Sequence, residues 1–115
     1  MATNSASTPK LNLTTDKTPA ETIVHCTGRI VWDAAELLRT TVKPLFSESK
    51  TVVLDLADVT YMDSCGLGTL VGLYTSAKAA NCQLRLINLN QRLKELFSIM
   101  RLGELMAQGR ASDYL

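Results

Sequence analysis

The hydrophobic and polar positions of this chain repeat with two different periods, which predict strands and helices in turn. Apolar residues at every second position, or in an unbroken run, predict strands at 11–14, 22–27, 52–56 and 84–87. Apolar residues three and four positions apart predict helices that begin near residues 33, 64 and 90. The order of these elements predicts an α/β domain with a mixed sheet of four or five strands and helices mainly on one face.

In two of the strand segments the pattern also predicts which faces are buried. In the second segment Thr22, Val24 and Cys26 share one face, His25 lies on the other, and Gly28 is expected to end the strand. The run Val52–Leu56 is apolar at neighbouring positions, as in a strand covered on both faces. We therefore expect this run to be a central strand.

The helix boundaries are predicted from capping residues and proline. Asp33 and Glu36 have the spacing of a capping box. Pro44 is expected to end or kink the first helix near Lys43, and Asn81 to end the second. Asn90 is expected to cap the third.

The same periodicity predicts which side of each later helix packs inward. In the second helix the inward residues are expected to be Leu67, Leu70, Val71 and Tyr74. In the third they are expected to be Leu93, Leu96, Phe97 and Met100. After Gly103 the pattern weakens, and Leu105 and Met106 are assigned to a short final helix or strand.

Composition narrows the class of protein. The chain has 115 residues, 46% of them hydrophobic, and a formal net charge of +1, so its charge predicts no nucleic-acid partner and no direct membrane partner. Residues 1–10 are polar and are interpreted as a flexible tail before a domain at 11–115. With no signal-peptide pattern and no apolar run of roughly 18 residues, the expected location is cytoplasmic.

Cysteine and histidine give little evidence of catalysis or metal binding. The three cysteines Cys26, Cys65 and Cys82 are odd in number and widely spaced, which does not indicate a disulfide framework. His25 is the single histidine, and no residues have zinc-site spacing. We therefore predict no metal and no cofactor.

The most informative segment is Asp63-Ser64-Cys65-Gly66-Leu67-Gly68, which lies where a strand turns into a helix. Asp63 has the position of a helix N-cap, and the free N–H groups of a helix start favour negative charge. Gly66 and Gly68 are both expected to let the first turn approach another backbone closely. Because Val71 stands where a third glycine would fall, the segment does not predict dinucleotide binding.

The hexapeptide resembles the Asp-Ser-Ser-Gly-Leu-Gly signature of STAS domains, specifically of bacterial anti-sigma factor antagonists. The segments 53–56 and 59–62 resemble the strand and loop that lead into that signature, and the likeness extends over about residues 11–105. It implies a non-enzymatic binding module that binds an anti-sigma factor, often a serine kinase, and so frees a sigma factor. The kinase phosphorylates the second serine of the signature and abolishes binding.

By position, the phosphoacceptor of the family falls on Cys65, while Ser64 lies one residue earlier. A serine kinase is not expected to phosphorylate a thiol, so the resemblance implies the fold and partner better than the switch. Trp32 is an anchor candidate, since tryptophan is enriched at binding hot spots, although packing beneath the first helix would explain it equally well. The candidate partner-binding residues are Asp63, Ser64, Cys65, Gly66, Leu67, Gly68 and Trp32.

Two other functions are compatible with the sequence. The loss of the acceptor serine favours an unphosphorylated STAS scaffold or accessory subunit of a multi-protein complex, such as a transporter. A thiol-based redox sensor or enzyme at Cys65 is the less favoured alternative, because no histidine or basic residue flanks this thiol.

Overall fold

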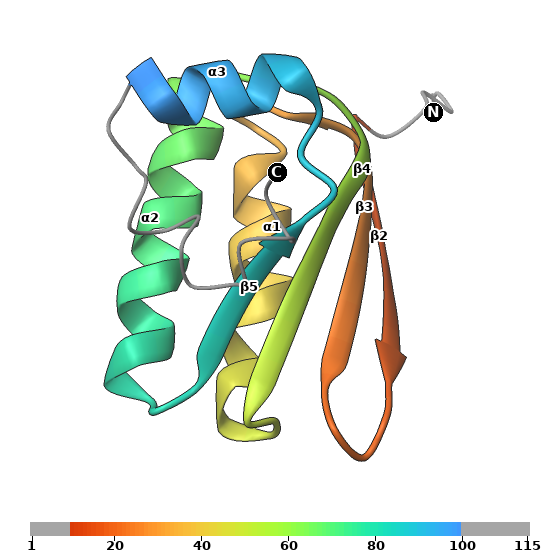
Figure 1. Cartoon of the computed structure of the whole chain (residues 1–115), viewed down its shortest axis with the longest axis vertical. Helices are drawn as coiled ribbons and strands as arrows, with labels where there is room; N and C mark the ends of the chain where they lie inside the picture. The colour runs from red at the N-terminus through yellow and green to blue at the C-terminus, as the bar shows by residue number, and fades with distance from the viewer. Residues whose placement is uncertain (1–9, 100–115) are drawn as a thin grey trace, which may run out of the picture.

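Within residues 10–99, the part of the chain that this computed structural model describes, four strands form one mixed sheet (Figure 1). Their order across the sheet is β2-β3-β4-β5, with β2 antiparallel to β3 and the other pairs parallel. The strands are β2 (Leu11–Lys17), β3 (Thr22–Ile30), β4 (Thr51–Met62) and β5 (Gln83–Ile87). The predicted mixed sheet is confirmed.

The helices lie mainly on one side of this sheet, as the sequence predicted (Figure 1). They are α1 (Ala35–Val42), the short 3-10 helix η1 (Lys43–Ser47), α2 (Ser64–Ala79) and α3 (Gln91–Ile99). Helices α1 and α2 run along one face of the sheet, and α3 crosses the end of the layers at which α2 begins (Figure 1). The crossovers through α1 and α2 allow β3, β4 and β5 to be parallel.

Strand β4 is the central element that the apolar run predicted. It lies between β3 and β5, and Val52, Val53, Leu54 and Leu56 are at most 3% exposed. With 12 residues the strand is longer than its apolar run, and it continues to Met62, directly before α2. The hexapeptide therefore begins directly after the central strand and lies at the edge of a well-packed sheet.

The predicted faces of β3 are confirmed, but its end is not. Thr22, Val24 and Cys26 are buried, and His25 is exposed. The expectation that Gly28 ends the strand is wrong, since β3 continues to Ile30. Gly28 has a φ of 115°, and a Cβ there would overlap the carbonyl oxygen of Lys10. This glycine therefore does not form a turn. It allows the backbone of Lys10 to pass close to β3, at the point where the register between β3 and β4 shifts.

The predicted capping box of α1 is also wrong. The N-cap is Ala34, without a side-chain cap, because the backbone N–H groups of Ala34 and Ala35 both donate to the carbonyl of Val31. Asp33 instead binds Lys10 through a 2.6 Å ion pair, and Glu36 pairs with Arg39. At the other end of α1 the prediction from Pro44 is confirmed, since the helix gives way to η1 after Val42.

The inward face of α2 differs from the prediction at one residue. Leu67 and Leu70 are buried as expected, but Val71 is 36% exposed. The helix instead packs Leu73 and Ala77 against the sheet. Tyr74 is partly buried against the same core.

The ends of the later helices follow the sequence signals. Asn81 follows α2 with a φ of 57°, the left-handed conformation that asparagine tolerates. Asn90 caps α3, because its Oδ1 accepts the N–H of Leu93 at 2.9 Å. Leu93 and Phe97 are fully buried and Leu96 is partly buried, as predicted.

Some of the sequence predictions concern residues outside 10–99. The predictions for Met100, for the segment after Gly103 and for residues 1–9 of the tail fall outside the described residues. In the part of the chain that is described, no helix is long and apolar enough to cross a membrane.

The burial difference within α2 gives a stability prediction. Leu67→Ala should lower the free energy of unfolding by about 2–5 kcal/mol, because it removes a side chain that is 3% exposed. The matched change Val71→Ala, one turn later on the exposed side, should cost less than about 1 kcal/mol. Chemical denaturation of both variants measures this difference. Equal losses would show that Leu67 does not anchor the helix.

Candidate functional site

The hexapeptide lies at an edge of the sheet where three helices begin. Strands β3, β4 and β5 are parallel, so their carboxyl ends meet at this edge, and each is followed by the start of a helix. In open α/β sheets this is the edge at which binding sites usually form. Asp63 connects the end of β4 to α2, which places Ser64 and Cys65 at the rim.

Asp63 links α2 to the neighbouring strand as well as capping it. Its Oδ1 accepts the N–H of Gly66 at 2.9 Å, which confirms the predicted N-cap. Its Oδ2 accepts the N–H of Trp32 at 3.0 Å, in the loop that follows β3. Its own backbone N–H donates to the carbonyl of Ile30 at 3.3 Å. The carboxylate therefore fixes the helix start relative to the Trp32 loop.

Gly66 and Gly68 have different roles, although the sequence grouped them together. A Cβ on Gly66 would overlap the carbonyl oxygen of Ile30 and lie 2.9 Å from Cγ of Met62, so the first turn of α2 touches the end of β3. A Cβ on Gly68 would meet no atom within 4 Å. The expected close approach is thus confirmed for Gly66 and wrong for Gly68.

This contact determines which residues of the hexapeptide reach the surface. Gly66 and Leu67 face the core, whereas Ser64, Cys65 and Gly68 are exposed. Trp32 is 74% exposed, so it does not pack beneath α1, and a hydrogen bond of its backbone holds it near the same helix start. The surface formed by Ser64, Cys65, Gly68 and Trp32 is called the rim surface below.

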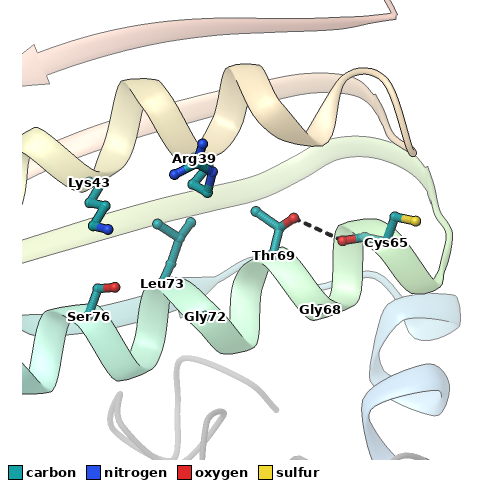
Figure 2. A pocket seen from close by; sticks show the side chains of 8 residues that line it. All are labelled: Arg39, Lys43, Cys65, Gly68, Thr69, Gly72, Leu73 and Ser76. Atoms are coloured by element: carbon teal, nitrogen blue, oxygen red, sulfur yellow. Dashed lines mark hydrogen bonds between the residues drawn. The ribbon is translucent and has the colours of Figure 1, made fainter.

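Two hollows flank α2. The first, the α1–α2 cleft, has a volume of about 420 Å³ and lies between the two helices (Figure 2). The second, of about 500 Å³, lies on the side of α3. Gly68 borders both hollows. The α1–α2 cleft is lined by Arg39, Lys43, Cys65, Gly68, Thr69, Gly72, Leu73 and Ser76, and the α3-side hollow by Tyr61, Met62, Asp63, Ser64, Leu67, Gly68, Val71 and Leu96.

Sequence analysis did not identify Arg39 and Lys43 as site residues. Arg39 lies in α1 and Lys43 is the first residue of η1, and only the packing of these helices beside α2 brings them to the cleft that Cys65 lines (Figure 2). The spacing Gly68-x-x-x-Gly72 was the available signal, because it leaves one stripe of α2 without side chains.

The three thiols differ in exposure. Cys26 is buried in the sheet, and burial, with a smaller contribution from Asp55, raises the pKa of its thiol to about 12. Burial also raises the pKa of Cys82. Cys65 is exposed. Their burial and raised pKa values make Cys26 and Cys82 unreactive thiols.

His25 is not placed to assist Cys65 as a base. It projects from the face of β3 opposite to the buried Cys26, whereas α2 packs on the Cys26 side. Its Nδ1 lies 3.0 Å from Oδ2 of Asp55. Over residues 10–99, no cluster of three His, Cys, Asp or Glu side chains could hold a metal ion.

Comparison with known proteins identifies the family. The model of the STAS domain matches residues 12–112. The chain belongs to the STAS domain family. This agrees with the resemblance of the hexapeptide, which lies within the matched range.

One curated protein and two solved structures are similar to this STAS domain. It is 37% identical over 83 residues to an anti-sigma-B factor antagonist of Bacillus subtilis (strain 168), an alignment that covers 72% of this chain and 76% of the relative. The unphosphorylated Bacillus SpoIIAA structure matches with a TM-score of 0.70 at 18% identity, over 82% of this chain and 84% of that one. The murine anion transporter Slc26a9 matches with a TM-score of 0.65 at 20% identity, over 73% of this chain and 14% of that one. These two structural likenesses show the shared fold.

The contrast between the two glycines is testable. Gly66→Ala should destabilise the domain by about 1–3 kcal/mol, because the added methyl group meets the Ile30 carbonyl. Gly68→Ala should instead stabilise it by up to about 1 kcal/mol, since alanine is the better helix former and the space is open. Thermal or urea unfolding of both variants measures the effect. A Gly66→Ala protein as stable as the wild type would contradict the close contact.

Proposed function

We propose that this STAS domain is an anti-sigma factor antagonist, a partner-switching regulator that binds an anti-sigma factor and so frees a sigma factor for transcription. The observation that carries the proposal is the sequence identity to the Bacillus subtilis anti-sigma-B factor antagonist over most of both chains. The domain acts by binding rather than by catalysis. Its cytoplasmic location belongs to the same proposal.

The rim surface is the proposed contact with the anti-sigma factor. Ser64, Cys65 and Gly68 are exposed on a helix whose start is held by Asp63 and by the Gly66 contact. Trp32 adds a large exposed aromatic side chain beside them. A rigid helix start with one exposed tryptophan suits recognition of a protein, since little conformational entropy is lost on binding. Asp63, Gly66 and Leu67 support the surface from beneath.

Cys65 changes the proposed switch. A phosphate at a helix start interacts favourably with the free N–H groups and the dipole, and it adds about two negative charges to a docking surface. The family's acceptor position holds a thiol here, so the chain stays in its binding-competent form in the presence of a serine kinase. Ser64 is exposed but lies one residue earlier, about 100° around the helix from Cys65.

The second candidate function is an unphosphorylated STAS scaffold or accessory subunit. The thiol at position 65 favours it, as does the fold shared with a part of the transporter Slc26a9. A redox role for Cys65 is less well supported, because His25 lies across the sheet and cannot serve as its base.

The binding proposal predicts a specific loss on truncation of Trp32. Isothermal titration of the purified chain against the anti-sigma factors encoded in the same genome should detect one complex. Trp32→Ala should weaken that complex at least tenfold, because it removes an exposed anchor without disturbing the core. Leu37→Ala, which truncates an exposed leucine of α1, is the control and should leave affinity unchanged. Absence of binding to every anti-sigma factor would favour the scaffold function.

The switch proposal predicts a gain of phosphorylation. With a cognate kinase and ATP, the wild-type chain should remain unphosphorylated, whereas Cys65→Ser should accept one phosphate and lose affinity for the anti-sigma factor. Mass spectrometry of peptides from both proteins locates the phosphate. Stoichiometric phosphorylation of Ser64 in the wild-type chain would instead establish a switch shifted by one residue.

A further inference from the structure

We propose that the α1–α2 cleft docks an acidic segment of a protein partner, with Arg39 and Lys43 as its cationic contacts. Arg39 of α1 and Lys43 at the start of η1 line the cleft opposite Thr69, Leu73 and Ser76 of α2 (Figure 2). That the partner is the anti-sigma factor rests on the proposed function. The preference of the cleft for carboxylates rests on its own shape and charge.

The floor of the cleft is open to a polypeptide chain. Gly68 and Gly72 lie one turn apart on α2, and a Cβ at either position would meet nothing within 4 Å. Nothing but helix backbone therefore covers this stripe of α2. The backbone of a partner segment can therefore approach α2 closely at these two glycines, beside Thr69, Leu73 and Ser76, and direct its own side chains toward Arg39 and Lys43.

The charge of the cleft has one sign. Arg39 and Lys43 are its charged lining residues, and the 16 residues of α2 include Lys78 but no acidic residue. Arg39 binds both carboxylate oxygens of Glu36 of its own helix, but both side chains are about half exposed or more, so the pair is screened by solvent and a partner carboxylate can compete with Glu36 for Arg39. Lys43 is exposed and forms no ion pair with any residue between 10 and 99. The cleft therefore presents positive charge that complements carboxylates.

The spacing of the two cations favours a segment over a small anion. Arg39 and Lys43 are four residues apart across the junction of α1 and η1, where the N–H of Lys43 still donates to the carbonyl of Arg39. Their side chains therefore lie on the same face, roughly 5–6 Å apart at Cβ. Two carboxylates on successive turns of a helix, or on alternate residues of an extended strand, have a similar spacing. Both cations are exposed to solvent rather than held in an enclosed pocket, so several weak contacts along a chain suit the cleft better than one small ion.

The cleft also adjoins the proposed rim surface. Cys65 and Gly68 belong to both, so a segment in the cleft would pass the family's phosphoacceptor position. A negative charge at position 65 would then lie beside the carboxylates of the partner. Repulsion between these negative charges would weaken the binding of the partner segment to the cleft.

The charge preference can be tested without knowledge of the partner. The ¹⁵N-labelled full chain is titrated with a hexaglutamate peptide at low salt, and amide chemical shifts are followed by NMR. The expected shifts are concentrated at Cys65, Gly68, Gly72 and Ser76, and the double variant Arg39→Gln/Lys43→Gln should weaken binding at least threefold. The control Lys50→Gln/Arg92→Gln removes the same two charges from exposed sites outside the cleft and should leave the cleft shifts unchanged.

Three results would overturn the inference. Hexaglutamate could cause no shifts, or shifts outside the cleft. The two double variants could weaken binding equally, which would indicate a non-specific charge effect. Inorganic phosphate at the same charge concentration could reproduce the cleft shifts, which would assign the site to a small anion.

The same pair of double variants separates this inference from the proposed function. If the anti-sigma factor binds the wild type and the control but binds Arg39→Gln/Lys43→Gln at least tenfold more weakly, both proposals hold. Equal binding to all three proteins, together with hexaglutamate shifts outside the cleft, would refute the cleft and leave the antagonist function intact. Cleft-specific shifts without any anti-sigma complex would refute the antagonist function and retain the cleft.

Discussion

The contact between the first turn of α2 and the end of β3 is the constraint on which the site depends. Gly66 allows this contact, because any side chain there would overlap the Ile30 carbonyl, and Asp63 secures it by bonding both the helix start and the N–H of Trp32. The direction of α2 is fixed at the sheet edge as a result. Ser64 and Cys65 then have to face outward, since the opposite side of the turn is packed against β3.

This arrangement explains why the acidic residue of the signature is not a sign of catalysis. Both oxygens of Asp63 accept backbone N–H groups, which is a structural task. The exposed side chains that remain at the helix start are a hydroxyl, a thiol and a tryptophan, and His25, the single histidine, lies on the other face of the sheet. An exposed helix start with a tryptophan beside it is suited to binding another protein. A thiol at position 65 keeps the shape of this surface and removes the hydroxyl that a serine kinase needs.

The two hollows beside α2 differ in chemical character, because different helices border them. The α1–α2 cleft is lined by the cations Arg39 and Lys43 and by Gly68 and Gly72, where no side chain covers α2. The α3-side hollow is lined mainly by apolar side chains, among them Met62, Leu67 and Leu96. The rim surface lies between them, because Gly68 borders both hollows. A partner that crosses the start of α2 would therefore meet charge on one side and apolar area on the other.

The sequence by itself determined the features that depend on neighbours along the chain. These were the order of strands and helices, the central β4 run, the cap at Asp63 and the buried Leu67, because periodicity and capping act over a few residues. Tertiary structure decided the rest. The capping box at Asp33 was lost to the Val31 carbonyl and to Lys10, and Gly28 proved to serve a strand contact. Contacts between segments far apart in the chain also decide the exposure of Trp32 and Val71, and they place Arg39 in the cleft that Cys65 lines. Local patterns do not encode such contacts.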